Sequence, residues 1–157
     1  MLAAQKVLAL EPFAKFIIIG EGDLLPKLIS TSISLGISRS VSFLGHVPDE
    51  IQRSAYARSD VFVMPSVSEP FGITALEAMA SGTPCIVSKS SGVGEAVKSC
   101  LRVDFWDVEE LANKIIELLR YPVARKSMGE AGLSEVKGFS WSKTAAETLS
   151  VYKEVIG

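Results

Sequence analysis

Short runs of β-branched and aromatic residues alternate along the chain with segments whose apolar residues recur every three or four positions. Short apolar runs predict buried strands, and the three-to-four spacing predicts helices that turn one face toward a core. The expected strands cover residues 15–20, 40–45, 60–65, 84–89 and 101–105. Alternation of such strands with helices of crossover length is typical of an α/β fold with a parallel sheet.

The expected helices lie between these strands and in the C-terminal part of the chain, at residues 23–35, 49–58, 72–81, 92–98, 107–120 and from about 141 onward. Helix 107–120 has the clearest pattern, because Asp107 and Glu110 have the spacing of a capping box and apolar residues repeat on one face. A further helix-like segment, residues 2–12, precedes the first strand, which is unusual for an alternating βα domain. We find no repeat or linker and expect a single domain over residues 1–157.

The composition narrows the function classes. With 157 residues, 48% hydrophobic and 22% charged, the chain resembles one ordinary globular domain. A formal net charge of −2 with scattered Lys and Arg gives no basic surface for a nucleic acid. Its apolar runs are far shorter than the roughly 20 residues of a membrane span, and the N-terminus lacks a signal-peptide pattern, so we expect a cytoplasmic protein. Cys85 and Cys100 have neither metal-ligand spacing nor a plausible disulfide framework, so we expect reduced thiols that are buried or half-buried.

Candidate ligand contacts follow the carboxyl ends of the expected strands, where ligands of open parallel sheets bind. Gly20 and Gly22 follow the first strand as a Gly-x-Gly without the third glycine of a dinucleotide motif, and a tight turn is the simpler interpretation. Gly45, His46 and Val47 follow the second strand. Glycine there can let the backbone approach a ligand, whereas a lone histidine is more often a loop or surface residue.

The segment EPFGITALE, residues 69–77, has sharper physical requirements. Pro70 favours an extended conformation for Glu69, which presents the carboxylate at the exit of a strand. The helix that begins near Phe71 or Gly72 has free N–H groups and the positive end of the helix dipole at its start. Such a helix terminus can bind an anion such as a diphosphate.

Glu77 lies on a helix that is apolar almost all round, which predicts burial on most sides. Because an unpaired buried carboxylate costs several kcal/mol, Glu77 either meets a structural donor or binds ligand hydroxyls. An equally open interpretation makes Glu69 a solvated loop carboxylate and puts Glu77 on a narrow exposed strip.

The residues PSVSEPFGITALEAMASGTPCIVSKSSGVGEAV resemble the Glu-x7-Glu segment of the retaining glycosyltransferases of family 4, the glycosyltransferase group 1 family. FIIIGEGDLLPKL, VSFLGHV, AYARSDVFVMPS and FSWSKTAAETLSVYKEV match the family's pattern in the same order, so the resemblance covers essentially the whole chain. It implies a Rossmann-like three-layer domain with a parallel sheet of about five or six strands flanked by helices. This would be the C-terminal, donor-binding half of the two-domain GT-B architecture, without the acceptor-binding N-terminal domain.

The resemblance also implies roles for individual residues. Glu69 would be the catalytic residue, contacting the hydroxyls of the transferred sugar and stabilising positive charge at its anomeric carbon. Glu77 would hydrogen-bond the ribose hydroxyls of the nucleotide. The other donor-binding candidates are Phe71, Gly72, Ile73 and Thr74 around the diphosphate, Gly45 and Val47 near the base, and Gly20 and Gly22.

The implied reaction transfers a sugar from a UDP-, ADP- or GDP-sugar to a hydroxyl of an acceptor sugar, glycan or lipid, with retention. It would need no cofactor and no metal, and the sequence has no Asp-x-Asp motif. The acceptor, and any peripheral membrane contact, would belong to the rest of a full-length protein.

Two features depart from the family's pattern. A strand whose Arg and Lys neutralise the diphosphate should precede residues 1–12, and the loop after Gly94 and Glu95 is shortened. We therefore expect a fragment that folds but is inactive by itself. A nucleotide-sugar 2-epimerase of the same architecture and a non-catalytic binding or interaction module remain as alternatives. The match around Glu69 favours a transferase over an epimerase.

The helix expected from about residue 141 carries an apolar stripe at steps of three and four: Trp141, Ala145, Leu149, Tyr152 and Ile156. In the family this helix crosses back to the other domain. Here we expect it either to pack on its own domain or to be partly exposed.

Overall fold

Five parallel strands form two sheets in the computed structural model, which describes residues 1–156. One sheet pairs β1 (Phe16–Ile19) with β2 (Val41–Gly45), and the other has the order β3 (Phe62–Met64), β4 (Cys85–Ser88), β5 (Leu101–Val103). The parallel α/β architecture expected from the sequence is confirmed. The strands do not form one continuous sheet, because no ladder within residues 1–156 joins β1 to β3.

Helices connect the strands and continue beyond them: α1 (Leu2–Leu10), α2 (Leu25–Ser34), the short 3-10 helix η1 (Ser38–Ser40), α3 (Asp49–Arg58), α4 (Ile73–Ala80), α5 (Gly92–Ala96), α6 (Val108–Arg120), α7 (Pro122–Val136) and α8 (Trp141–Ile156). Every element expected from the sequence is present within about three residues of its expected bounds. Helix α7 was not expected. Its buried face is made by Gly129 and Gly132, and glycine is a poor helix former that adds nothing to an apolar stripe.

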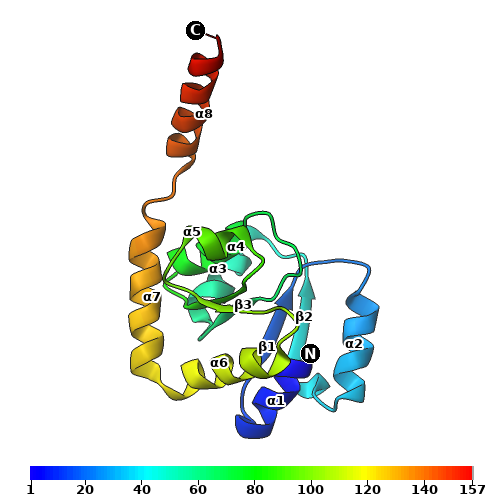
Figure 1. Ribbon diagram of the computed structural model, residues 1–157. Helices are drawn as coiled ribbons and strands as arrows, with labels where there is room; N and C mark the ends of the chain where they lie inside the picture. The colour runs from blue at the N-terminus through cyan, green and yellow to red at the C-terminus, as the bar shows by residue number, and fades with distance from the viewer. Residues whose placement is uncertain (157) are drawn as a thin grey trace.

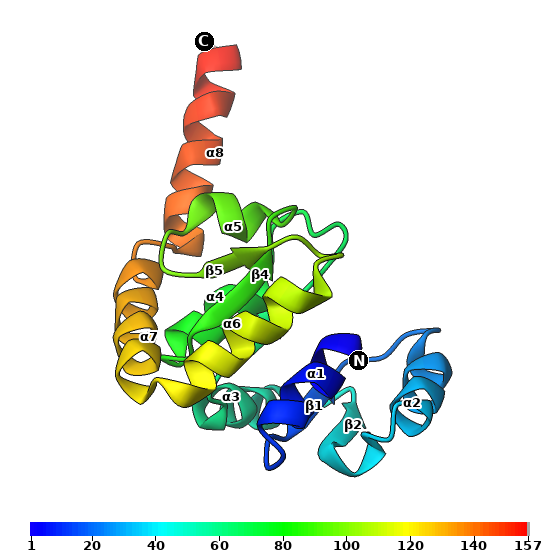
Figure 2. The same cartoon turned by 60° about the horizontal axis from the view of Figure 1, so that its bottom comes forward.

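Helices cover both faces of the three-stranded sheet (Figure 1). Along β4, Ile86 packs into a cluster with residues of α1 and α6, while Cys85 and Val87 pack into a cluster with residues of α3, α4 and α5. Figure 2 shows α6 in front of β4 and α4 behind it. The sheet is therefore the middle of three layers, and β4 is buried along its whole length, as expected for a central parallel strand.

Helix α1 packs against both sheets. Ala3 and Val7 belong to the cluster with β4, β5 and α6, whereas Ala4 packs with Val41 of β2. Strand β1 remains only partly covered, and the side chain of Ile17 is 51% exposed. The apolar run that predicted a buried strand thus lies at a sheet edge that the described residues leave open.

Two local predictions concern a helix cap and the cysteines. Asp107 caps α6, and its carboxylate accepts a hydrogen bond from the N–H of Glu110 at 2.8 Å, which confirms that half of the capping box. Cys85 and Cys100 are both free thiols, the first buried and the second half-buried, also as expected. Burial raises the pKa of the Cys85 thiol to about 12, so it is neutral at physiological pH.

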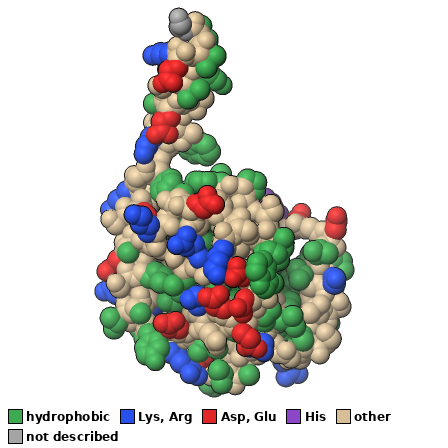
Figure 3. Space-filling model, in the orientation of Figure 1, with side chains coloured by type: hydrophobic (Ala, Val, Ile, Leu, Met, Phe, Trp, Pro, Cys, Tyr) green, Lys and Arg blue, Asp and Glu red, His purple; other side chains and the backbone are tan. Residues whose placement is uncertain are grey.

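Helix α8 extends away from the body of the molecule in both cartoon views (Figures 1 and 2). None of its described residues is buried, so of the two expected arrangements the structure has the exposed one. Figure 3 shows hydrophobic side chains along this helix, with acidic and basic ones between them. No helix within residues 1–156 has the length and apolar character needed to span a bilayer.

Candidate functional site

The N-terminus of α4 is open. Gly72 precedes the helix in a left-handed conformation, with φ of 104°, and α4 begins at Ile73. A Cβ atom on Gly72 would lie 2.7 Å from Cε of Met64 and 3.0 Å from Cγ1 of Val93, so only glycine fits. No side chain in the described range caps this helix. Its first N–H groups are therefore available to an anion, and both Ile73 and Thr74 are exposed.

The loop before α4 is tied to the start of α5. The N–H of Gly92 donates to the carbonyl of Glu69 at 3.1 Å, and the N–H of Val93 donates to the carbonyl of Phe71 at 2.5 Å. The Glu69 side chain is half-buried, and no hydrogen bond or ion pair within residues 1–156 engages its carboxylate. The backbone of Glu69 is thus held while its carboxylate stays available to a ligand.

Helix α4 is not buried on most sides, contrary to the expectation from its apolar sequence. It buries Ala75, Ala78 and Met79 in the cluster shared with the sheet and neighbouring helices, and exposes a strip that runs through Ile73, Thr74, Glu77 and Ala80. The strip follows the helical spacing of three and four. Glu77 is therefore accessible and lies one turn beyond the open helix terminus.

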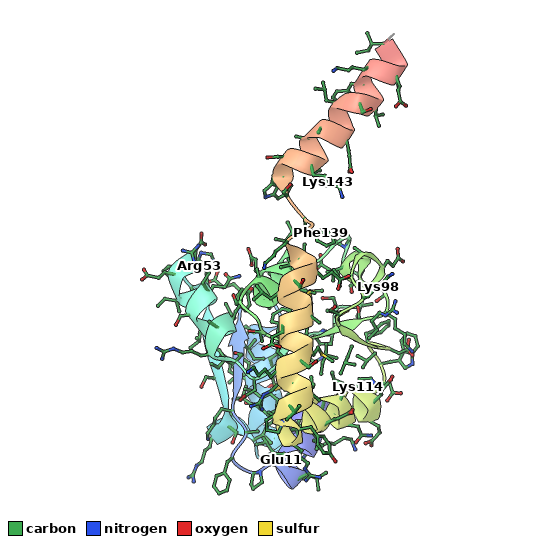
Figure 4. All side chains as sticks on the ribbon, turned by 90° about the vertical axis from the view of Figure 1, so that its left-hand side faces the viewer. Glu11, Arg53, Lys98, Lys114, Phe139 and Lys143 are labelled. Carbon is green, nitrogen blue, oxygen red and sulfur yellow. The ribbon has the colours of Figure 1, made fainter. Side chains whose placement is uncertain are left out.

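A hollow of about 330 Å³ lies between α3 and α4, lined by Asp49, Gln52, Arg53, Tyr56, Glu77, Ala80 and Ser81. In it, Oε2 of Glu77 accepts hydrogen bonds from Nε2 of Gln52 at 3.2 Å and from the hydroxyl of Tyr56 at 3.3 Å. Figure 4 shows Arg53 on α3 at the margin of the molecule. Glu77 thus has structural donors and also lies on an exposed strip, two features that the sequence had offered as alternatives.

Gln52 and Tyr56 were not among the residues selected from the sequence. Their spacing of four puts them on one face of α3, but nothing local indicates that this face lies opposite Glu77. Burial raises the pKa of Tyr56, an effect that the hydrogen bond from Gln52 opposes and the charge of Glu77 reinforces. The Tyr56 hydroxyl therefore stays protonated at neutral pH and can donate.

The glycine turns after β1 and β2 lie side by side. The N–H of Gly20 donates to the carbonyl of Gly45 at 2.9 Å, and the carboxylate of Glu21 accepts the N–H of His46 at 3.2 Å. The structure thus brings Gly20 and Gly45 together. The side chain of Val47 is buried, which leaves its backbone for any ligand contact.

No hydrogen bond in the described part of the chain joins these turns to residues 69–77. Gly22 is exposed, and a Cβ atom there would have no neighbour within 4 Å. The two groups of candidates therefore lie at the ends of different sheets, and their joint action stays a prediction.

The family model described as "Glycosyl transferases group 1" matches residues 1–135. The chain belongs to this family. Among the relatives of this group 1 chain, an uncharacterized glycosyltransferase of Methanocaldococcus jannaschii is 37% identical over 145 residues, which cover 89% of the chain and 37% of the relative. The D-inositol 3-phosphate glycosyltransferase of Segniliparus rotundus is 31% identical over 163 residues, which cover 99% of the chain and 36% of the relative. The chain thus spans little more than a third of these relatives.

Solved structures of glycosyltransferases have the same fold as this group 1 chain. Sucrose-phosphate synthase from Thermosynechococcus elongatus superposes with a TM-score of 0.86 at 26% identity, over 99% of this chain and 42% of that one. The Anabaena protein HepE in complex with UDP-glucose superposes with a TM-score of 0.82 at 26% identity, over 94% of this chain and 44% of that one. These matches confirm the expected Rossmann-like fold of the GT-B C-terminal domain.

One match is itself an isolated domain. The C-terminal domain of a glycosyl transferase group 1 family protein from Francisella tularensis gives a TM-score of 0.77 at 25% identity, over 87% of this chain and 75% of that one. That domain was crystallised without the rest of its protein.

Proposed function

We propose that the chain is the donor-binding domain of a retaining glycosyltransferase and binds a nucleotide-diphospho-sugar along α4. The observation that carries the proposal is the strip from the open terminus of α4 to the carboxylate of Glu77 in the hollow against α3. A helix terminus with free N–H groups suits a diphosphate, and a carboxylate one turn further suits hydroxyl groups. The UDP-glucose complex of HepE supports a ligand of this class.

In this proposal Glu69 and Glu77 bind opposite ends of one donor. The Glu77 carboxylate accepts hydrogen bonds from the ribose hydroxyls, and the N–H groups of α4 bind the diphosphate. The Glu69 carboxylate, on its fixed loop, stabilises the positive charge that develops at the anomeric carbon as the sugar leaves. The Glu69 carboxylate and the N–H groups of α4 thus act where charge forms in the transition state, which is where electrostatic stabilisation accelerates a reaction most.

Two cations of the three-stranded sheet region, Lys89 and Arg102, already have partners within the protein. Lys89, at the carboxyl end of β4, forms an ion pair with Asp104 at 2.7 Å. Arg102 donates a hydrogen bond to the carbonyl of Gly94 at 3.0 Å. We propose that the cations for the diphosphate and the acceptor site come from outside residues 1–157, in a cytoplasmic full-length enzyme. The isolated chain would then bind donor without transferring sugar.

Calorimetric titration of the chain with UDP, ADP and GDP tests the proposal. We expect selective binding of one nucleotide, and loss of that binding in Glu77→Ala. The matched control is Glu147→Ala, which removes an exposed glutamate from α8, far from the hollow, and should bind like the unaltered chain.

Absence of binding to all three nucleotides would contradict the proposal for this chain and favour a non-catalytic module. Binding that persists unchanged in Glu77→Ala would place the nucleotide elsewhere. Sugar transfer by the isolated chain above the spontaneous rate would contradict the expected inactivity.

A further inference from the structure

Three side chains form a hydrogen-bonded set across the hollow between α3 and α4. Nε2 of Gln52 donates to the Tyr56 hydroxyl at 2.7 Å and to Oε2 of Glu77 at 3.2 Å. The Tyr56 hydroxyl donates to the same Oε2 at 3.3 Å. Both donors therefore converge on one oxygen of the carboxylate, and no hydrogen bond within residues 1–156 engages Oε1.

Tyr56 is a rigid support for this set. Its side chain is 7% exposed, and its ring packs edge-to-face on Phe62, with centroids 5.5 Å apart. Its carbonyl also accepts a hydrogen bond from the Thr83 hydroxyl at 2.6 Å. An exposed glutamate on a helix otherwise samples several rotamers, and every rotamer that must be frozen on binding weakens affinity. Donors fixed on α3 remove that freedom before a ligand arrives.

We propose that Gln52 and Tyr56 are positioning residues that hold Oε2 of Glu77 and leave Oε1 free to accept hydrogen bonds from the ribose hydroxyls of the nucleotide. The inference rests on the proposed function, because it assigns the ribose to Glu77. It adds that the orientation of this carboxylate is set from α3, by side chains that need not touch the ligand.

Nucleotides that lack the ribose hydroxyls distinguish a lost orientation of the Glu77 carboxylate from a structural change of the whole binding site. The experiment titrates the 157-residue chain with the best-binding nucleotide of UDP, ADP and GDP, and with the 2′,3′-dideoxy form of the same nucleotide. In Tyr56→Phe, which removes the hydroxyl and keeps the ring, affinity for the ribonucleotide should fall about three- to tenfold, the usual effect of one lost intramolecular hydrogen bond. Affinity for the dideoxynucleotide should not change.

Gln52→Leu provides a second variant of similar size on the more exposed side of the hollow, and the same pattern is expected. Tyr152→Phe on α8 is the matched control, because it removes a hydroxyl from an exposed helix outside the hollow. In a Glu77→Gln background, Tyr56→Phe should have a smaller effect on ribonucleotide affinity than in the unaltered chain, because the charged acceptor is gone. Thermal unfolding of each variant verifies that the fold is retained.

The outcomes are distinguishable. Unchanged ribonucleotide affinity in both Tyr56→Phe and Gln52→Leu would overturn the inference while leaving the proposed function intact. An equal loss for the ribonucleotide and its dideoxy form would also overturn it, because the effect would then be structural. If the unaltered chain binds no nucleotide, the proposed function fails first and the inference falls with it.

Discussion

Glu69 and Ser91 pair as an isolated parallel β-bridge that joins the loop before α4 to the start of α5. Gly92, which follows Ser91, would carry a Cβ atom 2.3 Å from the carbonyl oxygen of Pro70. This approach is closer than any side chain tolerates. The backbone that presents the proposed catalytic carboxylate is therefore held by a contact that depends on glycine.

The first prediction concerns this contact. Gly92→Ala should displace residues 69–71 and lower the free energy of unfolding by about 1–3 kcal/mol, the usual cost of forcing extra atoms into a packed site. Urea unfolding measures the change. Gly138→Ala is the control, because its Cβ atom would lie 3.4 Å from the carbonyl oxygen of Glu135, an ordinary contact distance. Equal stability of the two variants would contradict the tight contact.

A second prediction concerns the carboxylate itself. Glu69→Gln in the full-length enzyme should lower kcat on the order of a hundredfold, because it removes a negative charge aimed at the anomeric centre. Binding of the nucleotide should change little, since the proposed nucleotide contacts are made by α4. Steady-state kinetics with the natural donor, together with a nucleotide titration, measure both quantities. Unchanged turnover would remove Glu69 from its proposed role.

A third prediction concerns the packing of α7 on α4. A Cβ atom on Gly129 would lie 2.2 Å from the carbonyl oxygen of Gly82, whereas one on Gly132 would lie 3.3 Å from Cε of Met79. Backbone cannot yield as a flexible side chain can, so Gly129→Ala should lower the free energy of unfolding by about 1–3 kcal/mol and Gly132→Ala by less. The reverse order in urea unfolding would show that α7 packs differently.

A fourth prediction concerns pH. Glu135 of α7 accepts the backbone N–H groups of Lys98 and Ser99, each at 2.8 Å. Burial acts to raise the pKa of Glu135, but these hydrogen bonds outweigh it and hold the pKa below its ordinary value of 4.5. A lowered folded-state pKa means that the carboxylate stabilises the fold above about pH 4.5 and loses this effect as the pH falls through the folded value.

Glu135→Gln should therefore be less stable than the unaltered chain at pH 7, and the difference should shrink below about pH 4.5. Unfolding followed across this pH range tests the sign. Glu147→Gln on the exposed α8 serves as the control. A difference that grows on acidification would refute the assignment.

The fifth prediction concerns α8. Because none of its described residues is buried, removal of residues 141–157 should change the free energy of unfolding of the remaining chain by less than about 0.5 kcal/mol. The Phe139 ring, 6.4 Å from that of Phe71 and labelled in Figure 4, is retained in this truncation. A marked loss of stability would mean that α8 packs on the body in solution.

The sequence by itself determined the positions of the strands and of most helices, because these depend on local apolar spacing and on caps such as Asp107. It also determined the family, through the segment around Glu69 and Glu77. It did not reveal α7, because that helix is buried through Gly129 and Gly132 and carries no apolar stripe.

Only the tertiary structure decided three further features. The strands divide into two sheets, and within residues 1–156 no backbone ladder joins β1 to β3. Helix α4 exposes one strip, because the sheet together with α3 and α7 covers only the rest of its surface. Glu77 receives hydrogen bonds from Gln52 and Tyr56, which are more than twenty residues away along the chain. Contacts of this kind follow from how helices pack, and local spacing does not encode which faces meet.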